Sequence, residues 1–393
     1  MPTLAGASRF CHEPVVAPPV KDTPAFVRWL MKRGATSPGA FLYPTSDEVA
    51  WLISAHREQL AQHFVLFQPD LAVLLSLLDK SRLYRLAAQL GIDTPATFFP
   101  TSDEAVRALG HELEQSAGYP VIVKPRTQAC MSVKLKGKVV HSTAQLQAAV
   151  AALREASFAT ARLWPDASDE VRWPLVQAYR AEAQQHTYSL AGFVDAGGTI
   201  RAARASSKVF QIPVQVGVGV AFEGRAVQAR QLAQVQALMN AAGYFGIFEV
   251  EFIHVPAQER YLLMDFNPRI YGQMQFEVAR GMLLPLMVHA AAVGDTATAD
   301  ALTADAVTAV RVGSSVAERY CDSWTFRMLL GAQHLGGRLS AQERTRWVDW
   351  MSHPGVIDAV AASDDPAPHT ARRLTFARQL VRHPRASLRT LFR

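Results

Sequence analysis

Alternating apolar and polar positions near the middle of the chain predict a β-hairpin. Residues 244–253 (YFGIFEVEFI) and 261–267 (YLLMDFN) are two short apolar runs, and a polar spacer of seven residues separates them. Short runs that are rich in aromatic and β-branched residues are typical of strands. Because successive side chains of a strand point to opposite faces, every second residue of each run is expected on the same face of the sheet.

Four oxygen-bearing side chains are expected to meet on one face of this hairpin. Glu249 and Glu251 share a face of the first strand. Asp265 and Asn267 share a face of the second strand, and Arg269 follows just beyond it. Hard oxygen ligands that leave room for phosphate suit a magnesium ion held jointly by protein and nucleotide. An ordinary hairpin with a solvated polar face explains the same pattern, so the metal hypothesis needs phosphate-binding residues elsewhere in the chain.

Two lysines upstream are candidates for that role. Residues 119–125 (YPVIVKP) form an apolar β-branched run that places Lys124 at the end of a buried strand. Lys80 lies in residues 79–95 (DKSRLYRLAAQLGIDTP), an amphipathic helix that ends at Gly91. A compact ammonium group can neutralise phosphate oxygens. Each lysine taken singly is equally well a surface charge, so the informative signal is the order of the features along the chain.

That order is a DK-helix, a strand ending in KP, then ExEF and DxNPR. It resembles the ATP-grasp superfamily, and especially its carboxylate–amine ligase branch, which includes D-aspartate ligase-like and other amino-acid ligases. The resemblance runs from about residue 46 to residue 313, with a weaker echo at residues 364–368 (DDPAP). It implies an α/β chain whose two α+β lobes hold ATP between them.

The resemblance also implies roles for individual residues. Lys80 and Lys124 would bind the ATP phosphates. Arg269 would stabilise the acyl-phosphate and the tetrahedral intermediate. The implied ligands of Mg²⁺ or Mn²⁺ are Glu251, Asp265 and Asn267, with Asp265 at the bridging position.

Nucleotide and substrate contacts are implied by two further segments. Residues 175–182 (LVQAYRAE) resemble the interdomain strand that hydrogen-bonds adenine through its backbone. Gln177 and Tyr179 would flank the base, and Glu182 would reach the ribose. Lys208, in SSKVFQIP, stands where related enzymes place a basic residue near the carboxylate substrate.

Three positions depart from the family pattern. The loop 126–137 (RTQACMSVKLKG) has no glycine before Gly137, which reduces the positive-φ conformations with which such loops close over phosphates. Asp265 replaces the commoner glutamate and is one methylene shorter. Gln177 stands where many relatives have glutamate, which removes a charge beside adenine. These departures bear on activity rather than on fold.

Composition limits the class of protein. With 393 residues, 49% of them hydrophobic, the chain can bury two or three cores. No run approaches the roughly 18 consecutive apolar residues of a membrane span, and the N-terminus lacks the pattern of a secretory signal. Cys11, Cys130 and Cys321 form neither a disulfide framework nor a zinc pattern, which favours a reducing cytoplasm. Cys130 has no identifiable base nearby in sequence and is interpreted as inert.

The formal charge of +6 is concentrated at the C-terminus, where residues 372–393 carry many arginines and no acidic residue. We favour a solvated amphipathic helix packed on the body of the protein for this tail. The alternative is a peripheral contact with an anionic surface such as membrane headgroups. No motif supports nucleic-acid binding.

Start and stop signals predict four segments. These are a shortened pre-ATP-grasp α/β domain (1–78), a first lobe (79–177), a second lobe with the metal hairpin (178–313), and a small helical C-terminal extension with the basic tail (314–393). The second lobe is expected to be an antiparallel sheet with helices on one face. Within it, residues 225–243 are expected to form a helix and residues 215–224 a glycine-rich loop.

The motif PTSDE occurs twice, at residues 44–48 and 100–104, and predicts a Thr-x-x-Glu capping box that starts a helix in each copy. The N-terminal domain begins part-way through the β-α-β unit usual in the superfamily, so an open strand edge is expected near Phe41, Leu42 and Val65. Exposed edges of this kind normally find a partner. We therefore expect a homodimer with residues 1–50 at or near its interface.

The resemblance implies an ATP-dependent ligase that activates a carboxylate as an acyl-phosphate and joins it to an amine, with small-molecule amino-acid or peptide-like substrates. One alternative is a nucleotide-binding regulatory or scaffold module that has lost ligation. A second is phosphoryl transfer from ATP to a hydroxyl group at the same site.

Overall fold

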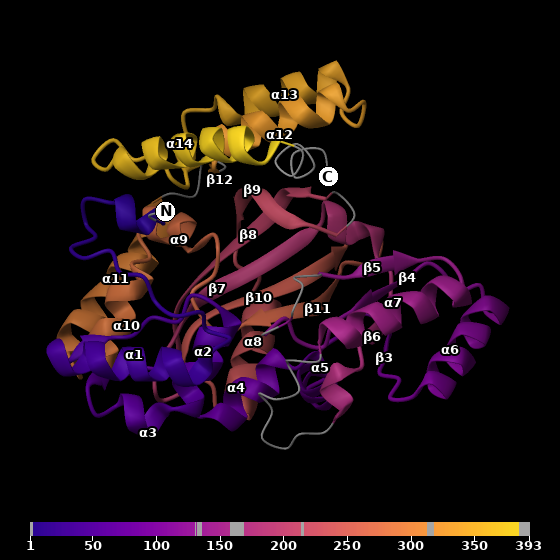
Figure 1. Cartoon of the computed structure of the whole chain (residues 1–393), viewed down its shortest axis with the longest axis horizontal. Coiled ribbons are helices and arrows are strands. Elements are labelled where there is room, and N and C mark those ends of the chain that lie inside the picture. Colours follow the sequence, from indigo (N-terminus) through magenta and orange to yellow (C-terminus); the bar gives the residue numbers. More distant parts are fainter. Residues whose placement is uncertain are drawn as a thin grey trace.

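The strands of the chain form three sheets within the residues that this computed structural model describes, namely 3–129, 131, 136–157, 169–213, 216–312 and 318–384, with the side chains of 169 and 308–312 excepted. A short parallel pair joins β1 (Ala40–Phe41) to β2 (Phe64–Val65). A four-stranded sheet has the order β3-β6-β4-β5, and a seven-stranded sheet has the order β11-β10-β7-β8-β9-β12-β13. Figure 1 shows the four-stranded sheet beside one end of the larger sheet, with helices around both.

The N-terminal unit packs four helices around the short parallel pair. The helices are α1 (Thr23–Thr36), α2 (Asp47–Ala55), α3 (Arg57–Leu60) and α4 (Leu71–Leu78). Their core includes Leu52, Leu60 and Leu74, which are fully buried. The apolar surface expected here is smaller than predicted, because Leu42 and Val65 are half-buried and Phe41 packs between Tyr43 and His289 of the second lobe. The sheet has only two strands, so each keeps one edge without a strand partner among the described residues.

Both copies of PTSDE start a helix, but the predicted cap is wrong by one residue. In α2 the Ser46 hydroxyl accepts a hydrogen bond from the Val49 amide at 3.3 Å. In α6 (Asp103–Gln115) the Ser102 hydroxyl accepts from the Ala105 amide at 3.0 Å. Serine is as good an N-cap as threonine, and this register places the two acidic residues of each motif in the first helical turn, where the helix dipole favours them.

The first lobe places helices on one face of the four-stranded sheet. Its elements are α5 (Lys80–Gln89), β3 (Thr97–Phe98), α6, β4 (Val121–Lys124), β5 (Lys138–Val140), α7 (Thr143–Ala156) and β6 (Leu175–Ala178). Leu109 of α6 and Leu146 of α7 pack with Val123 and Val176 of the sheet. Ser142 is the N-cap of α7, and its hydroxyl accepts a hydrogen bond from the Gln145 amide. Lys124 ends a strand whose other residues are buried, as predicted.

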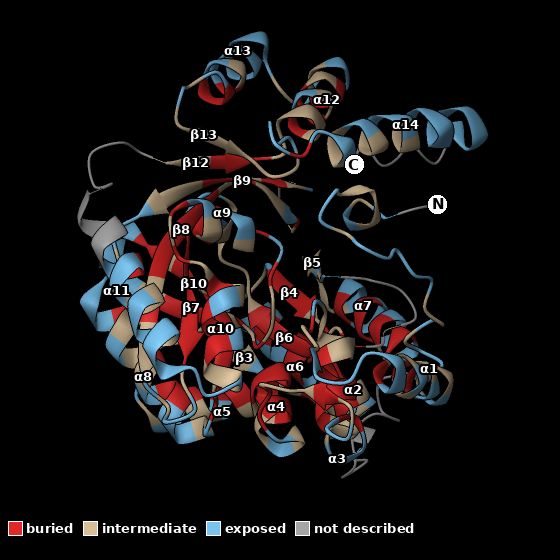
Figure 2. Ribbon diagram, turned by 90° about the vertical axis from the view of Figure 1, so that its left-hand side faces the viewer, coloured by how far each residue is buried: buried red, intermediate tan, exposed pale blue. Residues whose placement is uncertain are grey.

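The second lobe confirms the hairpin and corrects two expectations. Its strands are β7 (Thr187–Val194), β8 (Ile200–Ile212), β9 (Val218–Arg225), β10 (Gly246–Val255) and β11 (Arg260–Asn267). Most of the expected loop 215–224 is therefore strand β9. The adjacent residues Ile247 and Phe248 of β10 point to opposite faces, and each packs against helices. Helices thus cover both faces of the sheet, not one; they are α8 (Ala229–Ala242), α9 (Met274–Ala279), α10 (Leu284–Ala292) and α11 (Thr296–Val312). Figure 2 shows many buried residues in strands β7, β8 and β10 of this sheet.

The C-terminal segment is helical as expected and also adds two strands to the large sheet. Its elements are β12 (Arg319–Cys321), α12 (Ser323–Leu335), α13 (Ala341–Met351), β13 (Val356–Asp358) and α14 (Ala367–Arg382). Phe326, Trp347 and Trp350 form its core. Antiparallel pairing of β12 with β9 joins this segment to the second lobe.

Helix α14 contains the described part of the basic tail and packs on the body, which agrees with the favoured alternative. Arg372 forms an ion pair with Asp322, and the rings of Phe376 and Trp324 lie 5.4 Å apart. Just before the helix, Asp365 accepts a hydrogen bond from the Ser8 hydroxyl at 2.5 Å. Residues 385–393 lie outside the described part of the chain. No helix among the described residues has the length and apolar character needed to cross a membrane.

Candidate functional site

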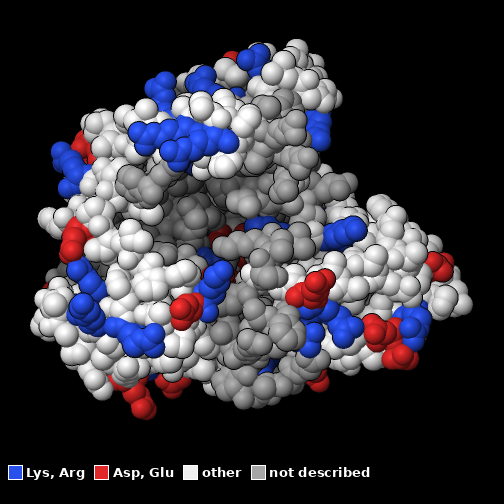
Figure 3. Space-filling model, in the orientation of Figure 1, with Lys and Arg blue, Asp and Glu red and all other residues white. Residues whose placement is uncertain are grey.

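A cleft lies between the four-stranded sheet and the seven-stranded sheet. Its volume is about 760 Å³, including the open mouth. Figure 3 shows the molecular surface hollowed between the C-terminal helices and the lower body, with basic and acidic residues at the bottom. Both lobes contribute to the lining of this interlobe cleft, with Lys80, Lys124, Gln177 and Tyr179 from the first lobe and Lys208, Glu251, Met264 and Asp265 from the second.

The hairpin of β10 and β11 brings the predicted oxygen ligands together. The strands pair antiparallel, so that Glu249 lies opposite Asn267 and Glu251 lies opposite Asp265. A register shift follows Glu251, where the two strands go out of step by one residue. The side chain of Glu251 is half-buried, lines the cleft, and forms no hydrogen bond or ion pair with any residue that the structure describes. Its carboxylate is therefore available to a ligand.

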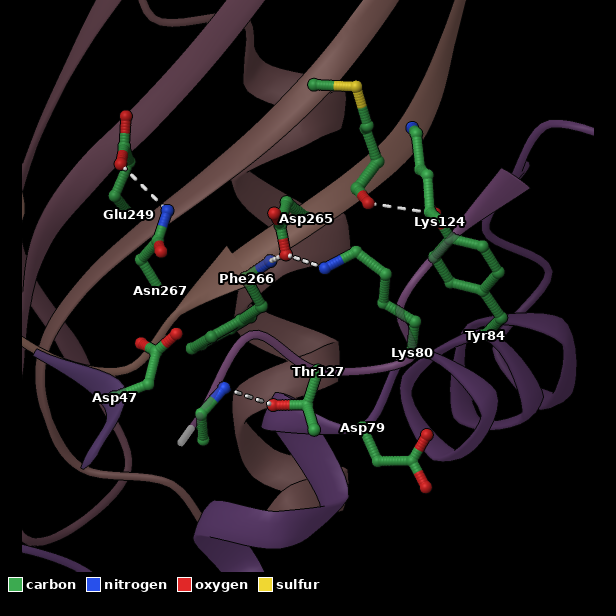
Figure 4. Close-up of polar contacts among 12 residues, drawn as sticks. Asp47, Asp79, Lys80, Tyr84, Lys124, Thr127, Glu249, Asp265, Phe266 and Asn267 are labelled. Atoms are coloured by element: carbon green, nitrogen blue, oxygen red, sulfur yellow. Dashed lines mark hydrogen bonds and ion pairs between the residues drawn. The ribbon is translucent and has the colours of Figure 1, made fainter. Parts of the chain in front are cut away.

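Lys80 reaches across the cleft to this hairpin. Its Nζ lies 2.7 Å from Oδ1 of Asp265, and the two side chains point toward each other in Figure 4. Burial opposes the charge on Lys80, but Asp265 outweighs it, and the pKa of Lys80 is raised. Burial also opposes the charge on Asp265, but Lys80 outweighs it, and the pKa of this carboxyl is lowered. Both groups are therefore charged near neutral pH.

A buried ion pair holds Lys80 in place. Asp79, the N-cap of α5, accepts hydrogen bonds from the Ser81 amide and from Arg126, whose Nε and Nη2 lie 2.9 and 2.6 Å from its two carboxylate oxygens. The amide of Lys80 donates to the Arg126 carbonyl at 3.0 Å. These contacts join the start of α5 to Arg126, which lies two residues after Lys124, the last residue of β4. The aspartate of the DK pair thus positions both lysines.

Lys124 points into the cleft beside Gln177. Its Nζ donates to Oε1 of Gln177 at 3.0 Å. Burial, together with the nearby charge of Lys80, lowers the pKa of Lys124 to about 8. The amide nitrogen of Gln177 donates to the hydroxyls of Tyr84 (3.2 Å) and Thr97 (2.9 Å). Gln177 lines the cleft, yet all of its described side-chain contacts are within the first lobe.

The segment predicted to contact adenine is shorter as a strand than expected. β6 ends at Ala178, and a 3₁₀ turn follows at Ala181–Gln184. Tyr179 lines the cleft, and its hydroxyl accepts a hydrogen bond from Gln184 at 2.6 Å. Glu182 lies in the turn and is not among the lining residues described, whereas Arg180 and Ala183 are. Sequence reasoning did not single out these last two residues.

A second compartment adjoins the cleft at Lys208 and Glu251, which line both. We call it the Arg269 compartment; it is also lined by Asn267, Arg269, Tyr271 and Tyr320. Lys208 lies on β8 and is 9% exposed, so its ammonium is presented to these two spaces rather than to bulk solvent.

Arg269 is held by three acceptors. Nε donates to Oδ1 of Asp47 at 2.5 Å, Nη2 donates to Oδ1 of Asn267 at 3.0 Å, and Nη1 donates to the Ile270 carbonyl at 3.0 Å. Burial opposes the charge, but Asp47 outweighs it and raises the pKa of Arg269. Sequence reasoning missed Asp47. In the sequence, Asp47 stands out only as part of the first PTSDE motif. That motif indicates the start of a helix and does not indicate a contact with a residue of another lobe.

Glu249 is buried at 2% exposure and so does not belong to a solvated polar face. Its Oε2 accepts from Nδ2 of Asn267 at 3.0 Å (Figure 4), and its Oε1 accepts from Gln273. Burial, reinforced by the charge of Glu251, raises the pKa of Glu249 to about 8. Glu249 therefore orients the amide of Asn267, so that the amide oxygen faces Arg269 and the compartment.

The donor set of the hairpin fits a hard divalent cation. Two carboxylates, Glu251 and Asp265, lie opposite each other, and the oriented oxygen of Asn267 follows on the same strand as Asp265. An amide oxygen has two lone pairs and can accept from Arg269 while it binds a metal. Within the described residues no three or more His, Cys, Asp or Glu side chains are grouped to hold a metal, so phosphate or water would have to complete the coordination.

The predicted phosphate loop 126–137 is described only in part. Residues 130 and 132–135, including Cys130, lie outside the described residues. Gln128 and Lys136 line the interlobe cleft, and Lys136 also lines the Arg269 compartment. Gly137 has a φ of 156°, and a Cβ there would lie 3.0 Å from the Val123 carbonyl, so a side chain at this position is disfavoured.

Comparison with known proteins finds likeness in structure alone. No family model and no curated protein matches the sequence. An L-amino acid ligase from Bacillus licheniformis superposes with a TM-score of 0.51 at 13% identity, over 71% of this chain and 62% of that one. Pyruvate carboxylase from Rhizobium etli superposes with a TM-score of 0.51 at 16% identity, over 70% of this chain and 23% of that one. The chain thus spans less than two thirds of either protein, and at these identities the likeness shows a shared fold.

Proposed function

Because this chain has the ATP-grasp fold, we propose that it is an ATP-dependent ligase that activates a carboxylate as an acyl-phosphate and joins it to an amine. The observation that carries the proposal is the meeting of two lysines with the acidic hairpin across one cleft. Lys80 contacts Asp265 directly, and Lys124 lies close enough to Asp265 and Glu251 for their charges to act on its pKa. Two cations facing two carboxylates suit a polyphosphate bound with a divalent metal.

The lysines would bind the phosphates and the hairpin would hold the metal. Lys124 and Lys80 would neutralise phosphate oxygens, and Glu251, Asp265 and Asn267 would ligate Mg²⁺ or Mn²⁺. The metal, when bound, supplies charge stabilisation for phosphoryl transfer. In this structure Lys80 is paired with Asp265, so binding of metal–ATP would replace one ion pair with two: lysine with phosphate, and carboxylate with metal.

The chemistry would proceed in two steps. A carboxylate oxygen attacks the γ-phosphorus, an acyl C–O–P linkage forms, and the bond to the bridging oxygen breaks to release ADP. The amine nitrogen then attacks the acyl carbon, an amide forms, the nitrogen loses a proton, and phosphate leaves. Arg269, beside Asn267, would stabilise the developing oxyanion, and Lys208 would hold the carboxylate between the two compartments. The amine needs no protein base beyond its own unprotonated fraction.

The test is release of phosphate from ATP by purified protein across a panel of amino acids and small carboxylic acids, singly and in pairs. We expect ADP formation that requires both a carboxylate and an amine. Hydroxylamine in place of the amine should trap the acyl-phosphate as a hydroxamate. A Lys124→Ala variant, which keeps the strand but removes the ammonium, should lose this activity.

Two results would contradict the proposal. Tight ATP binding without ADP formation for any pair, with Mg²⁺ or Mn²⁺, would make a nucleotide-binding regulatory or scaffold module the better description. ADP formation that depends on a hydroxyl compound and gives no hydroxamate would indicate phosphoryl transfer to that hydroxyl.

A further inference from the structure

A large apolar chamber lies between strand β9 and the C-terminal helices. Its interior volume is about 770 Å³, within the roughly 300–1,000 Å³ of an ordinary ligand pocket, and its mouth is open to solvent. Val218 and Val220 of β9 form one wall, and Trp324 and Met328 of α12 form another. Helix α14 contributes a further part of the lining.

One face of α14 is turned to the chamber. Arg372, Thr375, Phe376 and Gln379 line it and fall at helical spacing, whereas the adjacent Leu374 is 52% exposed and is not among the lining residues. Trp324 and Phe376 pack edge to face at 5.4 Å and join α12 to α14. Leu329 is buried, but most of the other apolar side chains that line the chamber are half-buried, and Val218 is 58% exposed on its wall. The described chain therefore covers these apolar side chains only in part.

The chamber is continuous with the proposed reaction site. Five residues line both the chamber and the Arg269 compartment: Lys136, Val218, Val220, Thr325 and Arg372. Lys136 also lines the interlobe cleft, so it stands where all three spaces meet. A molecule whose reacting group lies beside Arg269 can thus extend into the chamber without leaving the protein.

From this continuity we propose that the chamber binds a bulky apolar substituent, aromatic or aliphatic, of one of the two substrates. The proposal rests on the proposed function for the identity of the reacting groups. Lys136 and the ion pair of Arg372 with Asp322 lie where the chamber meets the Arg269 compartment, and valine, tryptophan, methionine and phenylalanine line the interior. The charged end of the substrate lies at this boundary, and its apolar body fills the chamber.

Binding of two probe series tests the proposal. One series is ω-phenylalkanoates and the other is ω-phenylalkylamines, each with one to five methylenes, measured by calorimetry with a non-hydrolysable ATP analogue and Mg²⁺ present. In one of the two series we expect each methylene to strengthen binding by about fourfold until the chamber is full. The series that responds identifies which substrate carries the apolar group.

Two variants of α14 form a matched pair. Thr375→Trp places an indole ring in the chamber and should weaken binding of the longest probe by at least about tenfold. Leu374→Trp places the same side chain on the outward face and should leave binding within about twofold. Val218→Trp fills the chamber from the opposite wall and serves as the second test if α14 shifts to accommodate the first. Affinity for the ATP analogue should stay unchanged in all three.

The absence of any length dependence in both series would overturn the proposal, as would equal weakening by Thr375→Trp and Leu374→Trp. These outcomes differ from failure of the ligase function. Tight, length-dependent binding that never leads to ADP formation would contradict the ligase and leave the chamber assignment standing. ADP formation with small polar pairs alone would contradict the chamber and leave the ligase standing.

Discussion

Replacing Asp47 with alanine removes the carboxylate that holds Arg269 from a different unit of the molecule. Asp47 lies in the first turn of α2, and its Oδ1 accepts from Nε of Arg269 at 2.5 Å. The other two acceptors of this guanidinium, Asn267 and the Ile270 carbonyl, lie within two residues of it and turn with the same strand end. Asp47 is thus its long-range anchor, and the expected result is lower turnover with a smaller change in nucleotide binding.

The size of the effect follows from the burial of the pair. Both side chains are 18% exposed. Exposed ion pairs contribute about 0.2–1 kcal/mol, whereas breaking a buried pair costs about 3–5 kcal/mol. This half-buried pair lies between these limits, at about 1–3 kcal/mol. If that energy is lost in the transition state, turnover falls by about fivefold to 150-fold.

The duplicated PTSDE motif offers a matched control. Asp103 occupies the same place after the Ser102 cap in α6, but its side chain is 65% exposed and pairs with Arg154 at 3.1 Å on the surface. Asp47→Ala and Asp103→Ala each remove one negative charge from a helix N-terminus, which is worth about 0.3–1 kcal/mol of stability. Thermal unfolding should therefore shift to a similar small extent in both variants, while turnover should fall in Asp47→Ala alone.

A double-mutant cycle decides whether Asp47 acts through Arg269. ADP formation is measured for Asp47→Ala, Arg269→Ala and the double variant. If Asp47 serves to position Arg269, the substitution of Asp47 should have little further effect once Arg269 is absent. An equal fold loss in both backgrounds would refute the reasoning, as would a loss in Asp103→Ala as large as that in Asp47→Ala.

Three further predictions concern the metal, pH and assembly. Asn267→Ala should lower turnover by about 100-fold or more with the fold intact, and Glu249→Gln should lower it by about tenfold, since Glu249 acts through Asn267. Turnover is measured across a Mg²⁺ titration. Equal small losses in both variants would indicate that the hairpin has an ordinary solvated polar face and holds no metal. The pKa of Lys124 is lowered to about 8 by burial and by Lys80, so the group loses its charge as pH rises above 8. ATP affinity should then fall by up to about tenfold per pH unit, while Lys124→Arg should flatten the profile; a flat wild-type profile from pH 7 to 9.5 would contradict this. Light scattering at micromolar concentration should show a dimer with residues 1–50 at or near its interface, and a monodisperse monomer would show that expectation to be wrong.

The sequence predicted those parts of the site that follow from a pattern of neighbouring residues. The hairpin follows from alternation within two runs, and the opposition of Glu251 to Asp265 follows once those strands pair. Lys124 follows from a buried strand with one charged end. In each case the pattern and its structural consequence lie on one strand or on two strands that are consecutive in the sequence.

What sequence did not predict depends on long-range contacts or on very short elements. Asp47 and Arg269 are 222 residues apart, and Gln177 meets Tyr84 at a separation of 93. Nothing in one sequence pairs such residues. Strands β12 and β13 have three residues each, too few for an alternating pattern to stand out. Asp79 stands in a DK dipeptide and Arg126 in a KPR tripeptide. Neither short motif indicates that the two side chains form an ion pair.

The N-terminal unit belongs to the site, although the expected boundary at residue 78 would assign it to a separate domain. Three neighbouring residues of this unit contact the second lobe: the Tyr43 hydroxyl donates to the Pro285 carbonyl at 2.7 Å, the Pro44 carbonyl accepts from the Ile270 amide at 3.1 Å, and Asp47 holds Arg269. The last two contacts fix adjacent residues at the end of the metal hairpin. Rotation of the N-terminal unit relative to the second lobe would therefore withdraw Asp47 from the guanidinium and leave Arg269 with its two local acceptors. Helices α1 to α4 of this unit line neither the interlobe cleft nor the apolar chamber. The orientation of Arg269, and with it the proposed stabilisation of the oxyanion, nevertheless depends on the N-terminal unit through Asp47.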